Sequence, residues 1–126
     1  MIEVNWDNDE QTIIMCQVST NWTIQDMHNM LLSANALTDS VAHNVYVIVN
    51  FSAARTVPSN IMSNLRSFSL KIHPRVKMAI DVTDSAVVET FTQMFTKVMN
   101  AKIEIQFART VEQAYELIQQ DIANSA

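Results

Sequence analysis

The chain has 126 residues, enough for one domain that removes roughly two thirds of its unfolded surface from water on folding. Hydrophobic residues make up 48% and charged residues 17% of it, which is typical of a globular protein and leaves no room for a long disordered segment. The net charge of -5 leaves no excess of Lys and Arg to neutralise phosphates, so nucleic acid and anionic membrane surfaces are not expected partners. We therefore treat residues 1–126 as a single domain.

The absence of glycine excludes several enzyme classes, because dinucleotide-binding turns, Walker-type phosphate loops and glycine-flanked nucleophile elbows all require it. No cofactor is expected. The single cysteine, Cys16, cannot form an internal disulfide, and residues 1–7 lack the basic region and apolar run of a signal peptide. No apolar run approaches the roughly 18 residues needed to cross a bilayer. We expect a cytoplasmic protein without membrane insertion.

Two strands are predicted at the start of the chain. Residues 2–6 alternate apolar and polar side chains, and residues 12–18 should pair back on them as a hairpin. The acidic residues 7–10 are typical of a solvated turn, and they lack the second set of oxygen ligands that a calcium loop would need. We predict no metal site there. Cys16 lies within the second strand, where a small buried thiol is the usual finding.

A helix is predicted over residues 23–39, because Thr23 and Asp26 have the spacing of a capping box. Its apolar stripe consists of Ile24, Met27, Leu31 and Ala34. Trp22 precedes the helix, where it could pack onto Met27 or close one end of a pocket. His28 falls on the more polar side of the helix and is interpreted as a surface residue.

Residues 45–49 are β-branched or aromatic without polar alternation, which predicts a central strand covered on both faces. A short polar loop follows, and Pro58 suits the first turn of a helix over residues 58–72. Ser59 is accordingly expected at the helix N-terminus. The side chains expected to face inward from this helix are Ile61, Leu65, Phe68 and Ile72.

The second half of the chain repeats the strand and helix alternation. Residues 76–82 read as a strand with Asp81 inside it, and residues 103–107 form the last strand. Between them, residues 83–85 cap a helix that should be deeply packed, and Thr110 begins a final helix. The broad stripe of the first of these helices comprises Val87, Val88, Phe91, Met94, Phe95, Val98 and Met99. The tail, residues 123–126, is expected to fray.

The element order is therefore β-β-α-β-α-β-α-β-α. This order predicts an α/β fold with a mixed, mostly parallel sheet of about five strands flanked by four helices. In open sheets of this kind, ligands and partners bind beyond the carboxyl ends of the strands. The residues that should lie at that edge, after the central strand, are Asn50, Ser52, Arg55, Ser59 and Asn60.

The order of the elements and the loop after the central strand resemble a STAS (sulfate transporter and anti-sigma factor antagonist) domain. In that family an apolar strand runs into Asp-Leu-Ser and, after a short loop, Asp-Ser-Ser-Gly-Leu. Here Asn50-Phe51-Ser52 and Pro58-Ser59-Asn60-Ile61-Met62 stand in register with the two motifs, although Pro58 replaces the Asp and Ile61 replaces the Gly. The resemblance implies a stand-alone bacterial regulatory domain, non-enzymatic, that binds a kinase-like or anti-sigma-factor-like protein. It also implies that Ser59 is the phosphoacceptor.

Two other functions stay open at this stage. Some of the 8 methionines could line a pocket for a small apolar, lipid-like ligand, with Trp6 and Trp22 at its mouth. The methionines considered for this pocket are Met27, Met30, Met62, Met78, Met94 and Met99.

A hydrolase or transferase would need Asp81, Asp84, Ser52 or Ser59 together with a histidine, and no spacing in the sequence favours that arrangement. We therefore expect that the protein is not an enzyme. Self-association is a further expectation, because the first strand should be an edge strand.

Overall fold

The computed structural model describes residues 1–99 and 103–125, and it has the predicted α/β fold. The strands in the described residues are β1 (Ile2–Trp6), β2 (Ile13–Val18), β3 (Val45–Asn50), β4 (Val76–Val82) and β5 (Glu104–Ala108). The helices are α1 (Ile24–Asp39), the short 3-10 helix η1 (Ile61–Asn64), α2 (Leu65–Leu70), α3 (Ala86–Met99) and α4 (Val111–Ser125).

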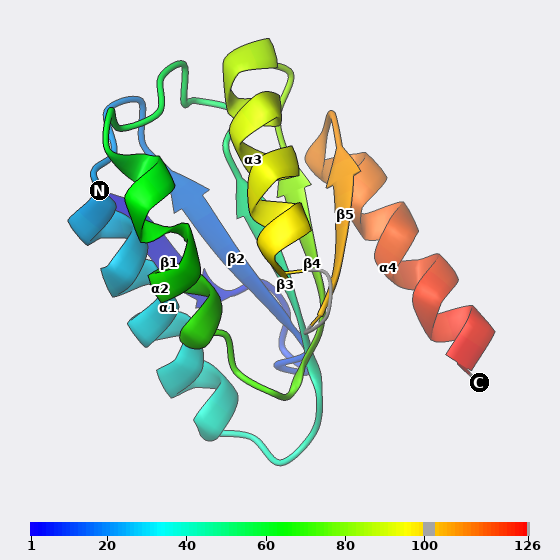
Figure 1. The fold of residues 1–126 in the computed structure, drawn as a ribbon. Helices are drawn as coiled ribbons and strands as arrows, with labels where there is room; N and C mark the ends of the chain where they lie inside the picture. The colour runs from blue at the N-terminus through cyan, green and yellow to red at the C-terminus, as the bar shows by residue number, and fades with distance from the viewer. Residues whose placement is uncertain (100–102, 126) are drawn as a thin grey trace.

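The sheet has the strand order β1-β2-β3-β4-β5 (Figure 1). Strands β1 and β2 form the antiparallel hairpin, and every other neighbouring pair is parallel. Strand β3 is central, as the uninterrupted apolar run predicts, and residues 45–49 are all buried. Strands β1 and β5 are the two edges of the sheet.

The helices cover the two faces of the sheet unequally. From β2 to β5 the chain moves one strand at a time in the same direction, and right-handed crossovers of this kind place their helices on the same face. Helices α1, α2 and α3 accordingly lie on one face, which we call the three-helix face, whereas α4 alone covers the opposite face, which we call the α4 face (Figure 1).

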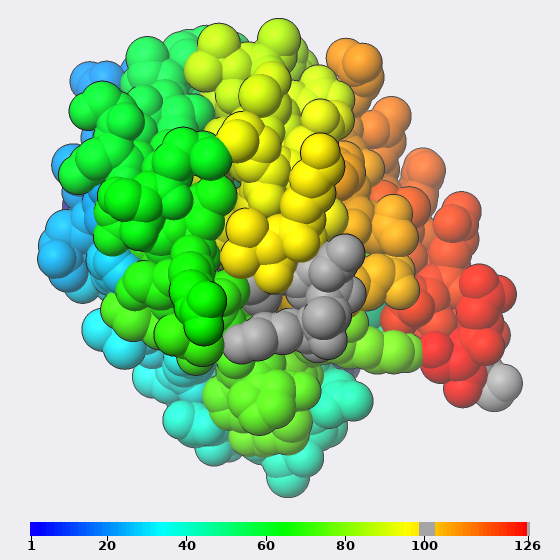
Figure 2. Space-filling view, in the orientation of Figure 1, coloured from blue at the N-terminus to red at the C-terminus, as the bar shows by residue number. Residues whose placement is uncertain are grey.

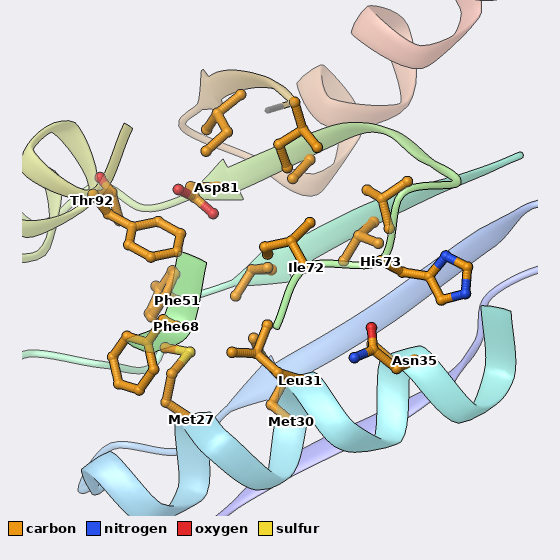
Figure 3. Close-up of a pocket in the computed structure, with 18 of the residues that line it drawn as sticks. Met27, Met30, Leu31, Asn35, Phe51, Phe68, Ile72, His73, Asp81 and Thr92 are labelled. Atoms are coloured by element: carbon orange, nitrogen blue, oxygen red, sulfur yellow. The ribbon is translucent and has the colours of Figure 1, made fainter. Parts of the chain in front are cut away.

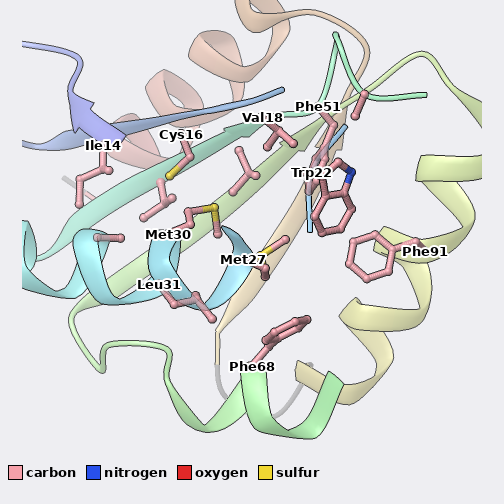
Figure 4. Close-up of a cluster of buried hydrophobic side chains, with 14 of the residues drawn as sticks. Ile14, Cys16, Val18, Trp22, Met27, Met30, Leu31, Phe51, Phe68 and Phe91 are labelled. Atoms are coloured by element: carbon pink, nitrogen blue, oxygen red, sulfur yellow. The ribbon is translucent and has the colours of Figure 1, made fainter. Parts of the chain in front are cut away.

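Each face has its own hydrophobic cluster, because successive strand side chains point to opposite sides of the sheet. Cys16 and Val49 belong to the cluster on the three-helix face, and Met15 and Ile48 belong to the cluster on the α4 face. The larger cluster lies on the three-helix face. It contains side chains of the sheet, of α1, α2 and α3, and of Trp22, which precedes α1 (Figure 4).

Helix α1 begins as predicted. The side chain of Thr23 accepts a hydrogen bond from the backbone N–H of Asp26 at 3.0 Å, and Asp26 accepts one from the backbone N–H of Thr23 at 2.9 Å. At the other end, Arg75 donates to the carbonyl oxygens of Thr38 and Val41. This guanidinium gives the carbonyl oxygen of Thr38 a second donor beside the backbone N–H of Val41, and it ties the end of α1 to the start of β4.

The helix predicted over residues 58–72 is shorter than expected, and its first part is a 3-10 turn. Serine hydroxyls compete with helical hydrogen bonding, and Ser63 and Ser69 donate to the carbonyl oxygens of Asn60 and Arg66. The prediction that Ser59 lies at a helix N-terminus is therefore wrong, because the α-helical part begins only at Leu65.

Two further expectations about helices need correction. In α3, Val88 and Phe91 are buried, but Val87 and Val98 are exposed, because only one side of this helix faces the sheet. The side chain of Met99 lies outside the described part of the structure. The tail does not fray after residue 122, since α4 continues to Ser125, whose hydroxyl accepts a hydrogen bond from Lys77 at 2.6 Å. Residue 126 lies outside the described residues.

Within the described residues, no helix combines the length and the apolarity that crossing a bilayer requires.

Candidate functional site

The first candidate site is the polar edge that follows β3. Asn50 is fixed there from two sides, because its amide nitrogen donates to the side-chain oxygen of Gln17 at 3.0 Å. Its amide oxygen accepts from the backbone N–H of Ser52 at 3.0 Å and from the Ser52 hydroxyl at 2.6 Å. This Asx turn gives the start of the loop a defined shape.

An ion pair connects this loop to the segment after the neighbouring strand. The guanidinium of Arg55 lies 3.3 Å from the carboxylate of Asp84, which follows β4. Both side chains are more than half exposed, so the pair adds little stability. It leaves both charges accessible at the carboxyl edge of the sheet.

Ser59 and Asn60 lie in a turn that precedes η1. The turn is closed by a hydrogen bond from the backbone N–H of Ile61 to the carbonyl oxygen of Pro58 at 3.1 Å. Both Ser59 and Asn60 are exposed. Within the described part of the chain the Ser59 hydroxyl has no hydrogen-bond partner, and the helical segment that follows begins as η1 and becomes α-helical only at Leu65.

The loop between β3 and η1 is anchored from below by aromatic side chains. Trp22 is buried, and its indole N–H donates to the carbonyl oxygen of Thr56 at 3.0 Å. Its ring lies 5.8 Å from that of Phe51 and 5.7 Å from that of Phe91, measured between centroids. Trp22 therefore supports the loop from within the core and does not stand at the mouth of a pocket.

Two exposed apolar side chains follow polar residues of this edge in the sequence, Met62 three residues after Ser59 and Val87 three residues after Asp84. Met62 in η1 and Val87 in the first turn of α3 have 53% and 57% of their surface exposed. The sequence pattern instead places Met62 in a pocket and Val87 in a packed stripe, and both expectations are wrong. We call the following residues the edge surface: Asn50, Ser52, Arg55, Ser59, Asn60, Met62 and Val87. It combines polar side chains with exposed apolar ones, as many protein interfaces do.

The second candidate site is a cavity of about 60 Å³ between the sheet and the helices of the three-helix face (Figure 3). Helices α2 and α3 lie against each other on the outside of this region (Figure 2). The wall is almost entirely apolar and includes Met27, Met30, Phe51, Phe68, Phe91 and Phe95. Aromatic rings dominate one end of it.

Among the described side chains, two methionines meet the expectation of a methionine-lined pocket. Met27 and Met30 line the cavity, whereas Met78 faces the α4 face and Met62 is exposed. Drug-sized ligands occupy clefts of roughly 300–1,000 Å³. The cavity as it stands is therefore too small for a lipid-like molecule.

Asp81 is the one carboxylate in the described wall of the cavity. Its side chain projects from β4 toward the three-helix face, and only 6% of its surface is exposed. It shares the end of the cavity where Thr92, Phe51 and Phe68 lie, whereas His73 lies at the other end (Figure 3). Burial raises the pKa of Asp81 from 3.8 to about 7.

The other polar side chains of the described wall have partners. The amide of Asn35 donates to the carbonyl oxygen of Lys71 at 2.7 Å, and the hydroxyl of Thr92 donates to the carbonyl oxygen of Glu89 at 2.9 Å. His73 lies 2.7 Å from the carboxylate of Asp39. None of these groups donates a hydrogen bond to Asp81 within the described part of the chain.

Cys16 lies on the same row of the sheet as Asp81, since Cys16 pairs with Val49 and Val49 pairs with Asp81. The thiol of Cys16 is fully buried. Its pKa is raised to about 12, mainly by this burial and to a smaller extent by the nearby charge of Asp81. A thiol held in the protonated form is not a nucleophile.

In the described part of the chain, two of the side chains considered for a hydrolase or transferase are bonded to other groups. Ser52 is bonded to Asn50, and Asp84 is paired with Arg55. His28 accepts from Lys71 at 2.7 Å. Across residues 1–99 and 103–125, no hydrogen bond joins a histidine to the four side chains that the sequence offered for catalysis, which are Ser52, Ser59, Asp81 and Asp84.

The acidic turn after β1 is organised by hydrogen bonds. The side-chain oxygen of Asn8 accepts from the backbone N–H groups of Thr12 and Ile13, and Asp7 accepts from the hydroxyl of Tyr115 at 2.7 Å. Among the described residues, no group of three or more His, Cys, Asp or Glu side chains is arranged to hold a metal ion.

No protein-family model, no curated protein and no solved structure matches this chain. The functional argument therefore rests on the edge surface and on the cavity around Asp81.

Proposed function

We propose that the chain is a non-enzymatic regulatory domain that binds another protein through its edge surface, in the manner of the STAS domains that its sequence resembles. The observation that carries this proposal is the exposure of Met62 and Val87, which follow Ser59 and Asp84 closely in the sequence. Exposed apolar side chains rimmed by polar ones are typical of protein interfaces. The α/β fold class agrees with the resemblance but is shared by many unrelated proteins.

The rigidity of the loop supports specific binding. The Asx turn at Asn50 fixes the start of the loop, and the hydrogen bond from the indole of Trp22 to Thr56 holds its middle to the core. A preformed surface loses little conformational entropy when a partner binds. The partner, a kinase-like or anti-sigma-factor-like protein, would therefore meet a surface that is already in its bound shape.

Phosphorylation of Ser59 would provide the control. The hydroxyl is exposed in a turn, and a phosphate would add about -1.5 to -2 charges close in sequence to the apolar Met62. Charge placed in an apolar contact is costly to desolvate, so we propose that the modification weakens binding. This effect of the phosphate does not depend on a helix N-terminus.

The proposal is tested by capturing partners from the source organism with wild-type protein and with Met62→Ser/Val87→Ser. The matched control is Leu32→Ser, which removes an apolar side chain of similar exposure, 58%, from α1. We expect the double variant to lose the captured proteins and the control to retain them. Equal capture by all three proteins would refute the edge surface as the binding site.

The control by phosphate needs a separate measurement. Peptide mass spectrometry of the protein recovered from its own cells should find phosphate on Ser59, and Ser59→Asp should capture less partner than Ser59→Ala. If Ser59 carries no phosphate under any growth condition and both variants bind equally, the resemblance in this motif has no regulatory meaning.

A further inference from the structure

Asp81 is an unusual wall group because the protein buries it and yet, among the described residues, gives it no hydrogen-bond donor. Buried carboxylates are normally paired, since an unpaired one is expensive to remove from water. The polar side chains that share its cavity already donate to other acceptors, as described for Asn35 and Thr92. The described residues therefore leave Asp81 open to a donor from a water molecule or a ligand.

The surroundings of Asp81 are suited to one type of donor. The rings of Phe51, Phe68, Phe91 and Phe95 all line the cavity. They form a connected aromatic group, with centroids 6.3 Å apart for Phe51 and Phe91, 6.2 Å for Phe91 and Phe95, and 6.4 Å for Phe68 and Phe95. Aromatic faces attract cations, and a carboxylate pairs with them directly.

We propose that the cavity beside Asp81 is a binding site for a small organic ammonium ion. The ammonium group donates hydrogen bonds to the carboxylate of Asp81, and the alkyl part contacts the phenylalanine rings and the methionine side chains of α1. A metal ion is a poorer match, because the described wall offers a single carboxylate and few other oxygen ligands.

The volume of the cavity limits the size of the ligand. An engineered protein cavity of about 150 Å³ accommodates benzene, with six heavy atoms, so a cavity of about 60 Å³ holds only two to four. Methylammonium, ethylammonium and other amines of this size fit, whereas tetraethylammonium does not. The size distinguishes this site from the lipid-like pocket considered from the sequence.

Binding can be measured by NMR on protein with labelled methionine methyl groups, since Met27 and Met30 line the cavity. Ethylammonium chloride is titrated at a pH above 8, where Asp81 is ionised. We expect saturable shifts of the Met27 and Met30 methyl signals. Ethanol, which has the same number of heavy atoms and no charge, should bind at least about 10-fold more weakly, and tetraethylammonium should give no saturable shift.

Two matched variants show whether Asp81 is responsible. Asp81→Asn keeps the shape of the side chain and should weaken ethylammonium binding about 10-fold or more, whereas Asp121→Asn, on the opposite side of the sheet, should leave it unchanged. The proposal is overturned if the wild-type signals do not saturate at concentrations on the order of 100 mM, if ethanol binds as tightly, or if Asp81→Asn binds as the wild type does.

Discussion

Two aspartates on opposite sides of the same sheet have pKa values that are shifted in opposite directions. On the α4 face, Asp121 accepts hydrogen bonds from the hydroxyl of Tyr46 at 2.7 Å and lies 2.9 Å from the ammonium of Lys77. These partners hold the pKa of Asp121 below its ordinary value of 3.8. On the three-helix face, burial raises the pKa of Asp81 to about 7.

The contrast separates a structural carboxylate from one that is available for binding. The carboxylate of Asp121 links α4 to β3 and β4, because its partners Tyr46 and Lys77 belong to those strands. The carboxylate of Asp81 makes no hydrogen bond or ion pair with another described residue, and it faces a cavity. The aspartate without a donor among the described residues thus lies on the three-helix face, and this is where we infer a ligand site.

The largest expected effect on stability tests whether the hydrophobic clusters on both faces of the sheet stabilise the fold. Phe68 and Ile118 are fully buried on opposite sides of the sheet. Phe68→Ala should lower the free energy of unfolding by about 3–5 kcal/mol and Ile118→Ala by about 2–5 kcal/mol. Urea unfolding measures both. A change below about 1 kcal/mol for Ile118→Ala would mean that α4 does not pack on the sheet as described.

The next effect comes from Asp81. The unfolded chain ionises near 3.8 and the folded protein near 7, so the folded state holds the proton more tightly between these values. The resulting stability is present below the unfolded pKa and is lost as pH rises to about 7, a change on the order of 2–4 kcal/mol. Asp81→Asn should remove this pH dependence in urea unfolding between about pH 4 and about pH 8. A variant with the wild-type pH profile would contradict the burial of the charge.

Asp121→Asn should have a smaller effect with the opposite pH dependence. Because the pKa of Asp121 is lowered, its contribution is present above the unfolded pKa and is lost as pH falls through the folded one. We expect the substitution to cost about 0.5–1 kcal/mol near neutral pH, since the ion pair is partly exposed. The cost should disappear in acid. A stabilising effect at neutral pH would remove the distinction between the two aspartates.

The smallest effect on stability is expected at Ser59, which lies on neither face. Ser59→Asp should change the free energy of unfolding by less than about 0.5 kcal/mol, because the side chain is exposed and has no hydrogen-bond partner among the described residues. Leu65→Ala, at a buried position of the adjoining helix, should cost about 2–5 kcal/mol. Thermal melts of both variants give the comparison, and a large loss with Ser59→Asp would show that the turn is part of the core.

The sequence predicted the order of the elements well because the strands and helices carry strong periodic patterns. The central strand and the capping box of Thr23 were confirmed, since both depend on local residue types. The helix after Pro58 was predicted too long, because serines that favour turns interrupt its apolar stripe. Val87 was misplaced, since an apolar stripe does not reveal how much of it the rest of the fold covers.

Asp81 was placed correctly in a strand, but its environment was missed. One signal could have revealed it: parallel strands are covered on both faces, so a charged residue between Ile80 and Val82 must be buried. The absence of a donor could not be predicted. Asn35 and Thr92 belong to helices α1 and α3, and the acceptors of their hydrogen bonds are set by how these helices pack and are built.

The most direct test of the account is an NMR titration of the aspartate carboxyl carbons, with Asp81→Asn and Asp121→Asn used for assignment. We predict a midpoint of about 7 for Asp81 and a midpoint below the ordinary value of 3.8 for Asp121. A midpoint of Asp81 at or below its ordinary value would show that the carboxylate has a partner or reaches water, and it would contradict both the comparison of the two faces and the ligand site inferred from it.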